Sequence, residues 1–294
     1  MAETRAPRTG RLRREAEGEA ARFPALLAEA ERIAASVMHG THGRRRPGMG
    51  ESFWEYRPHR REDGATRVDW RRSARGDQLF VRETEWEAAN GVFLWRDGDA
   101  GMALSSPSLP VKRDRAAVCL IALASLLSRG GERIAALGET GPARGGRRGL
   151  ERTAQALADG PGDVRSVEAP ALPRHAHVVL ASDFLDPAET WQARLAGLRA
   201  TGAGGALLRV VDPAEEDFPF SGRTRFRDPA SNGDLLFGRA QSARDTYQTL
   251  WREHADALAR LARRSGFTLI THRTDRPAAS AVMALYQVIA GMDR

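Results

Sequence analysis

Cysteine is almost absent from this chain of 294 residues. The single cysteine, Cys119, excludes an intrachain disulfide and any zinc site built on cysteine pairs. It lies in the apolar run of residues 116–127, which predicts a packed core position. That run is too short to cross a bilayer, so we expect no membrane span. An apolar stretch is also missing behind Arg13 and Arg14, which argues against an export signal and for a cytoplasmic protein.

Lysine is equally scarce. Lys112 is the only one, so arginine supplies nearly all of the cationic charge behind the formal net charge of +7. A GC-rich genome accounts for part of such a bias, and arginine content alone therefore does not indicate nucleic-acid binding. The length and the apolar content of 41% suffice for one large α/β domain plus an accessory segment, or for two small domains.

The signatures of common enzymes are missing too. The glycine-rich run of residues 141–149 has no Gly-Lys-Ser/Thr ending and no dinucleotide-binding spacing that opens a helix. His175 and His177 lack the helix and the companion carboxylate of a zinc hydrolase motif. We therefore expect a protein that is not an enzyme.

Apolar runs alternate with segments of helical spacing over most of the chain. Strands are predicted at 91–95, 133–137, 177–181, 206–211 and 267–270, a hairpin at 224–227 and 235–237, and helices at 19–38, 113–127, 150–158, 190–200, 244–264 and 278–289. This order predicts a doubly wound, mostly parallel sheet with helices on both faces. We expect a disordered tail at 1–18, a helix and arm at 19–88 packed on the main domain, and that domain at 89–294.

Acidic residues follow the predicted strands. Asp97 and Asp99 come after the first strand and Asp183 after the third. The carboxyl ends of parallel strands share one edge, and ligands bind there where the strand order reverses. Two interpretations remain open: a crevice that binds a divalent ion, or a charge cluster that serves as a partner surface.

The arm contains Trp54, Tyr56, Trp70 and Phe80 among eleven arginines within residues 43–85. Large aromatics dominate protein cores, which favours packing for the tryptophans, whereas clustered arginines cannot all be buried cheaply. The predicted partner-binding residues are Arg57, Asp69, Trp70, Arg71, Arg72 and Arg75. An alternative is nucleic-acid binding through Arg71, Arg72 and Arg75, although six acidic residues within residues 44–82 weaken the positive potential.

The arm also resembles a known family pattern. Gly48, Gly50, Phe53 and Arg57, followed by Asp69, Trp70, Ser73, Ala74 and Arg75, match G-x-G-x-x-F-x-x-x-R and I-D-W-x-x-S-A-R. Residues 182–187, 212–216, 219–224 and 271–275 are similar to later motifs of the same family. This is the bacterial family of unknown function called DUF58, and His59 and Glu62 depart from its pattern. The resemblance implies a von Willebrand factor A-like domain.

Such a domain carries a metal-ion-dependent adhesion site, and the resemblance implies a degenerate one here. Its D-x-S-x-S motif falls on residues 97–101, with Asp99 and Gly101 in place of hydroxyls, and Arg147 stands where a threonine is usual. We therefore expect no cofactor, with Mg²⁺ as the alternative, and an arginine that pairs with the aspartates in place of a metal. The resemblance implies an adaptor that acts with a MoxR-type AAA+ ATPase.

Overall fold

The computed structural model describes residues 24–38, 53–58, 68, 70–74, 76, 78–84, 91–139, 141–159, 172–173, 175–227 and 233–292. The chain divides into two compact units, one of residues 1–44 with 90–294 and the other of residues 45–89. The predicted tail at 1–18 lies outside the described residues. That the arm packs on the main domain stays a prediction.

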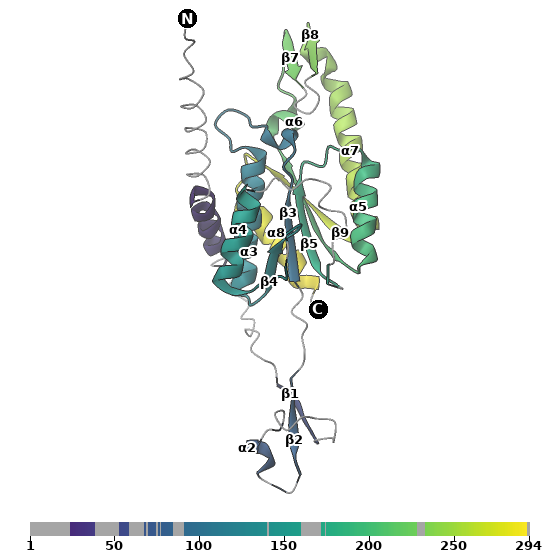
Figure 1. The fold of residues 1–294 in the computed structure, drawn as a ribbon. Coiled ribbons are helices and arrows are strands. Elements are labelled where there is room, and N and C mark those ends of the chain that lie inside the picture. The colour runs from purple at the N-terminus through teal and green to yellow at the C-terminus, as the bar shows by residue number, and fades with distance from the viewer. Residues whose placement is uncertain are drawn as a thin grey trace, which may run out of the picture. The chain divides into compact units, whose positions relative to one another are not determined.

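A five-stranded parallel sheet forms the centre of the first unit (Figure 1). Its strands, in spatial order, are β4 (Arg133–Ala136), β3 (Gly91–Arg96), β5 (His177–Ser182), β6 (Gly204–Val211) and β9 (Phe267–Arg273). The chain runs outward from β3 to β4 and returns to β5 on the other side of β3. The strand order therefore reverses between β3 and β5, and the predicted doubly wound α/β class is confirmed.

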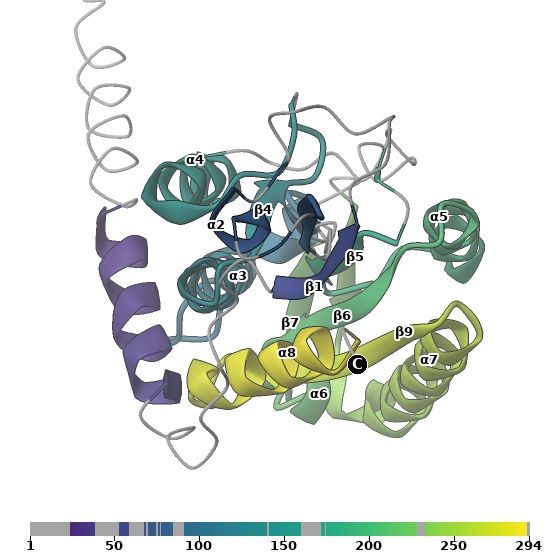
Figure 2. The ribbon, with the colours of Figure 1, turned by 90° about the horizontal axis from the view of Figure 1, so that it is seen from below.

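Helices cover both faces of the sheet, as Figure 2 shows. One face carries α3 (Lys112–Arg129), α4 (Gly146–Asp159) and α8 (Ala278–Met292), and the other carries α5 (Ala188–Ala200) and α7 (Arg244–Arg264). Every residue of β3 and of β5 is buried, which explains why these strands read as continuous apolar runs.

The helix of residues 24–38 packs against the first of these layers. Leu26, Ala30, Ala34 and Val37 are buried in the same core cluster as α3 and α8. Their spacing of three and four residues places them on one face of the helix. The described part of this helix thus shares one core with α3 and α8.

Cys119 lies in the middle of α3 and has no exposed surface. Burial raises the pKa of its thiol to about 12. The prediction of a core cysteine is confirmed.

A short helix that sequence periodicity did not indicate follows β6. It is α6 (Pro213–Asp217), and Asp212 caps it in a capping box with Glu215. Pro213 occupies the first helical position, where its missing N–H costs no hydrogen bond. This helix brings Glu215 to the carboxyl edge of the sheet.

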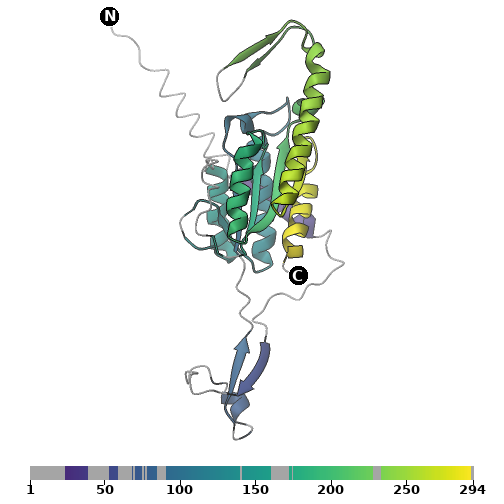
Figure 3. The same ribbon diagram turned by 90° about the vertical axis from the view of Figure 1, so that its right-hand side faces the viewer.

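The predicted hairpin is present as β7 (Thr224–Arg227) and β8 (Asp234–Phe237), which pair antiparallel. Phe226 contacts Phe218, Phe220 and Phe237, and Phe218 also contacts Tyr247 of α7. Figure 3 shows the hairpin beyond the end of α7. The residues of the predicted turn at 231 and 232 lie outside the described part of the chain.

The second unit contains β1 (Phe53–Pro58) and β2 (Phe80–Thr84), which pair antiparallel, and the single turn α2 (Trp70–Ser73). Ser73 is buried, and its Oγ accepts a hydrogen bond of 2.9 Å from the backbone N–H of Phe80. This bond ties α2 to the start of β2. The described part of the arm is therefore folded.

Within the described segments, none of the helices combines the length and the apolar character that a bilayer crossing requires.

Candidate functional site

The structure brings Asp97 and Asp183 to the point where the strand order reverses. Asp97 follows β3 and is 1% exposed, and its backbone N–H donates to Ala181 of β5 over 2.8 Å. Asp183 directly follows β5 and is also buried. Because β3 and β5 are hydrogen-bonded neighbours, the two acidic residues meet at the carboxyl edge, as the sequence predicted.

Asp97 is held by two donors. Ser182 Oγ donates to Asp97 Oδ2 over 2.5 Å, and the Asp99 backbone N–H donates to Oδ1 over 2.9 Å. Burial is the main cause that raises the pKa of Asp97 to about 6, and the charges of Asp99 and Asp183 add to it, against the two hydrogen bonds. A carboxyl group in this state ionises at a cost to the fold.

Lys112 supplies the cation of the crevice. Its ammonium lies 2.9 Å from Asp183 Oδ2 and 2.6 Å from Glu215 Oε1, and the side chain has no exposed surface. Burial raises the pKa of Glu215, and the adjacent Lys112 charge opposes this shift. Buried Asp183 and partly buried Glu215 thus share one ammonium, which gives both carboxylates an ionic partner.

The prediction that an arginine pairs with the aspartates of the crevice is wrong for Arg147. Arg147 does not enter the crevice: it lies in α4 with its side chain 89% exposed, and its Nε bonds Glu151 Oε1 over 2.7 Å. Lysine suits the crevice better, because its ammonium is a compact point charge, whereas a guanidinium is a planar fork. The sequence shows a single lysine, but it does not indicate which carboxylates that lysine contacts.

The glycine in the motif of residues 97–101 has a packing reason. A Cβ at Gly101 would lie 3.0 Å from Asp183 Oδ2, closer than ordinary contacts allow. A serine at this position would therefore push against the carboxylate that Lys112 holds. The close approach of the Asp183 carboxylate therefore explains why glycine stands here instead of serine.

Asp212 links the start of α6 to the loop that contains Ser106 at the same edge. It has no exposed surface and accepts hydrogen bonds from the backbone of Ser106 over 2.7 Å and of Ala214 over 2.9 Å, and also from the Ser106 hydroxyl. Its own backbone N–H donates to Glu215 Oε2 over 2.8 Å. Glu215 is thereby oriented toward Lys112, so the capping box of α6 is part of the crevice.

Another set of carboxylates could hold a metal ion. Asp97, Asp99 and Asp186 each offer an oxygen, and these oxygens lie within 4.8 Å of one another. The predicted set contained Asp183, but Asp183 forms an ion pair with Lys112. The third carboxylate near Asp97 and Asp99 is that of Asp186. Asp186 Oδ2 is also 3.9 Å from Arg194 Nη1, a contact that competes with a metal. Three carboxylates leave about half of an octahedral Mg²⁺ shell to water.

A second buried cation lies on the opposite face of β6. Arg209 is buried, and its guanidinium carbon is 4.4 Å from the centre of the Trp251 ring. Burial lowers the pKa of Arg209, although Glu215 and Asp183 act in the other direction. His254 of α7 places Nε2 2.7 Å from the Phe184 carbonyl oxygen.

The predicted partner-binding residues of the arm are only partly described. Within its own unit, Trp70 is 63% exposed and Arg71 is also exposed, and packing of Trp70 on the main domain stays a prediction. Arg57 and Arg72 lie in β1 and α2, but their side chains, like that of Trp54, are outside the described part. Asp69 and Arg75 lie outside it altogether. Partner or nucleic-acid binding by this arm stays a prediction.

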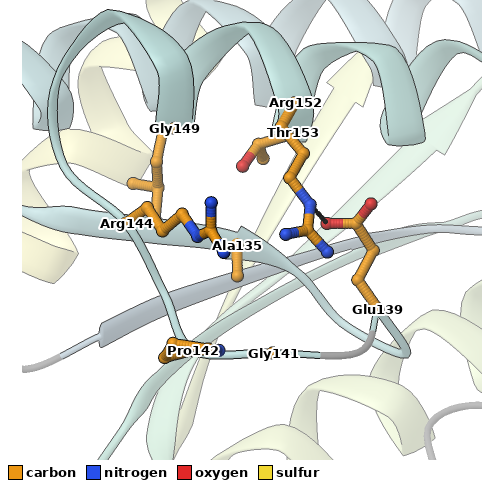
Figure 4. Close-up of a pocket in the computed structure, with 9 residues that line it drawn as sticks. Ala135, Glu139, Gly141, Pro142, Arg144, Gly149, Arg152 and Thr153 are labelled. Atoms are coloured by element: carbon orange, nitrogen blue, oxygen red, sulfur yellow. Dashed lines mark ion pairs between the residues drawn. The ribbon is translucent and has the colours of Figure 1, made fainter.

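The glycine-rich run of residues 141–149 lines a small pocket beside β4 (Figure 4). Its space of about 210 Å³ is below the usual size of a ligand site. Arg152 pairs there with Glu139 over 3.3 Å, and Gly149 is required because a Cβ would lie 2.3 Å from the Arg144 carbonyl oxygen. The run has a structural role here.

Sequence reasoning missed three residues of the crevice: Lys112, Glu215 and Asp186. One signal was available for Lys112, because it is the only lysine in a chain that otherwise uses arginine. For Glu215, the Asp-Pro-x-Glu spacing is a recognisable capping box, but it does not reveal what the glutamate contacts. No sequence signal separates Asp186 from other exposed acids.

The solved structures similar to this chain include two proteins of Bacteroides. An aerotolerance-related membrane protein from Bacteroides fragilis aligns with a TM-score of 0.41 and 15% identity over 69% of this chain and 99% of that chain. The conserved hypothetical protein BatB from Bacteroides thetaiotaomicron aligns with a TM-score of 0.36 and 14% identity over 69% and 98%.

Sequence comparison finds closer relatives. The uncharacterized protein Mb1516 of Mycobacterium bovis and the uncharacterized protein Rv1480 of Mycobacterium tuberculosis are each 30% identical over 258 residues, covering 82% of this chain and 80% of theirs. The family described as "Protein of unknown function DUF58" matches residues 55–257, which is more than half of the chain. The chain therefore belongs to the DUF58 family.

Proposed function

We propose that this protein is a non-catalytic interaction module that acts as an adaptor for a MoxR-type AAA+ ATPase. The ATPase follows from the family resemblance, and the crevice at the carboxyl edge supplies the contact surface. The single observation that supports this proposal best is the buried ammonium of Lys112 between Asp183 and Glu215.

The ammonium has two consequences. It contacts both carboxylates and offsets one of their two negative charges, so the edge keeps its shape without a metal ion. It is also fully buried and therefore cannot receive an acidic side chain from a partner, as an exposed metal ion would. The groups that remain accessible are exposed Asp99 and half-buried Asp186, beside exposed Leu104 and Leu185. We call these four residues the acidic rim, and they fit a partner surface with basic and apolar side chains.

Neutralising the rim is expected to weaken ATPase binding. The double variant Asp99→Asn and Asp186→Asn keeps the side-chain shapes but removes two charges, so we expect about a tenfold loss of affinity or more in a pull-down or calorimetric titration with the MoxR-type ATPase. Asp256→Asn, at an exposed position of α7, is the matched control and should bind like the wild type. Equal binding by all three proteins would contradict a role of the rim.

A second candidate function rests on the carboxylate set of Asp97, Asp99 and Asp186. If these residues hold Mg²⁺, the protein is a metal-dependent ligand-binding or enzymatic module. The residues fit a hard cation in donor type, and they would hold it through three oxygens while waters complete the shell.

Calorimetric titration with Mg²⁺ and Mn²⁺ separates the two candidates. Under the adaptor proposal we expect no binding heat at millimolar metal, because Lys112 already neutralises Asp183, and Asp186 lies near Arg194. Asp99→Asn serves as the control for nonspecific heat. Saturable heat that Asp99→Asn abolishes would support the metal-dependent function instead.

A further inference from the structure

Exposed apolar side chains gather at one end of the first unit. Leu104 and Leu185 lie in the loops that follow β3 and β5, Leu235 and Leu236 lie in β8, and Leu250 lies in the first half of α7. In the described part of this unit, Met292 is the other large hydrophobic residue with comparable exposure. Monomeric proteins rarely leave such side chains grouped in contact with water.

The hairpin of β7 and β8 cannot cover its own leucines. Leu235 and Leu236 are consecutive, so they point to opposite faces of the ribbon, and they are 59% and 52% exposed. The face of Phe226 and Phe237 packs on the aromatic cluster around Phe218. A second surface is therefore needed to cover the opposite face, where Leu236 lies across from Arg225. A two-stranded hairpin alone is only marginally stable in water.

The charge of the hairpin is positive. Four exposed arginines lie on it or beside it: Arg223, Arg225, Arg227 and Arg239. Asp234 is shared between Arg225 at 3.8 Å and Arg227 at 3.3 Å, so one carboxylate faces two guanidinium groups. The hairpin thus fits a surface that combines acidic and apolar side chains.

The acidic rim has that composition, with Asp99 and Asp186 beside Leu104 and Leu185. Figures 1 and 3 show the hairpin at the same end of the unit as α6, which follows the carboxyl end of β6. Two copies related by a twofold axis can therefore each place a hairpin on the rim of the other. Such an isologous contact covers both surfaces twice.

We propose that the β7–β8 hairpin of one copy docks on the acidic rim of a second copy, which gives a reciprocal dimer. The inference rests on the proposed function in one respect, since it uses the same rim as a docking surface. Dimerisation occupies this rim, so self-association and ATPase binding exclude each other. The ATPase then binds the monomer and shifts the equilibrium away from the dimer.

Charge exchange tests this contact with the full chain. In sedimentation equilibrium the wild type is expected to form dimers that weaken as salt is raised, because the contact is largely electrostatic. The hairpin variant Arg225→Glu with Arg227→Glu and the rim variant Asp99→Arg with Asp186→Arg should each be monomeric. An equimolar mixture of the two should dimerise again. In the mixed dimer, the glutamate hairpin of one variant meets the arginine rim of the other, and the unchanged arginine hairpin meets the unchanged acidic rim.

Two further variants complete the design. Leu236→Ser should weaken dimerisation by about tenfold or more, since Leu236 is the apolar residue on the hairpin face that docks. Arg260→Glu with Arg263→Glu, at exposed positions of α7, alters the charge equally and should dimerise like the wild type. Circular dichroism and thermal melting verify that every variant is folded.

Three results would overturn the proposal: a wild type that is monomeric at low salt at the highest soluble concentration, a dimer that the hairpin variant leaves intact, or a mixture that stays monomeric. These outcomes are distinguishable from a failure of the proposed function. The hairpin variant has an unchanged rim, so it should still bind the ATPase even though it no longer dimerises. Loss of ATPase binding in the rim variant with unchanged dimerisation would reject this contact as well.

Discussion

Replacement of Lys112 by methionine is expected to lower the free energy of unfolding by about 3–5 kcal/mol, the usual cost of removing one partner from a buried ion pair. Methionine fills similar space but leaves buried Asp183 and partly buried Glu215 without their cation. Urea unfolding at neutral pH measures this change. In a thermal melt, a domain of this size loses roughly 2–4 °C for each kcal/mol.

A matched variant separates the charge from the packing. Lys112→Met combined with Asp183→Asn and Glu215→Gln removes all three charges together, and we expect it to regain most of the lost stability, because neutral groups of similar volume tolerate burial. The loss in Lys112→Met alone should also shrink as the pH is lowered, because burial raises the pKa of Glu215 and the opposing Lys112 charge is gone in this variant. If Lys112→Met alone were as stable as the wild type, the ammonium would not stabilise the carboxylates of Asp183 and Glu215.

Asp97→Asn is expected to stabilise the protein at about pH 8 and to have little effect at about pH 4. Burial raises the pKa of Asp97 from 3.8 to about 6, so the folded state binds this proton more tightly than the unfolded chain does. Stability therefore falls as the pH rises from about 4 to about 6 and stays reduced above that range. At about 1.4 kcal/mol for each pKa unit, the gain from removing this ionisation is at most about 3 kcal/mol.

The measurement is the free energy of unfolding of wild type and variant across this pH range. Asparagine can still accept a hydrogen bond from the Asp99 backbone, which limits the loss of contacts. Asp256→Asn is the control and should show no comparable dependence, because its side chain is exposed. A difference between Asp97→Asn and wild type that is the same at both ends of the range would contradict the raised pKa. A bound Mg²⁺ would reverse the sign, since the ion favours the ionised carboxylate.

The fold could be predicted because its determinants are local. The strand at 177–181 and the helix at 244–264 are visible as an apolar run and as a helical repeat, and the structure places β5 and α7 there. Their alternation along the chain then predicts a parallel sheet. The positions of Asp97 and Asp183 after two such strands were enough to predict that the acidic residues meet at one edge.

The identity of the cation was beyond local reasoning. Arg147 was assigned to the crevice from its place in a motif, but it lies on the exposed side of α4. Lys112 reaches its partners across 71 and 103 residues of sequence. Charge and spacing along the chain therefore determined the sheet and its acidic edge. Only the tertiary structure decided which carboxylates are neutralised and which remain accessible, because burial and ion pairing depend on the depth at which distant segments meet.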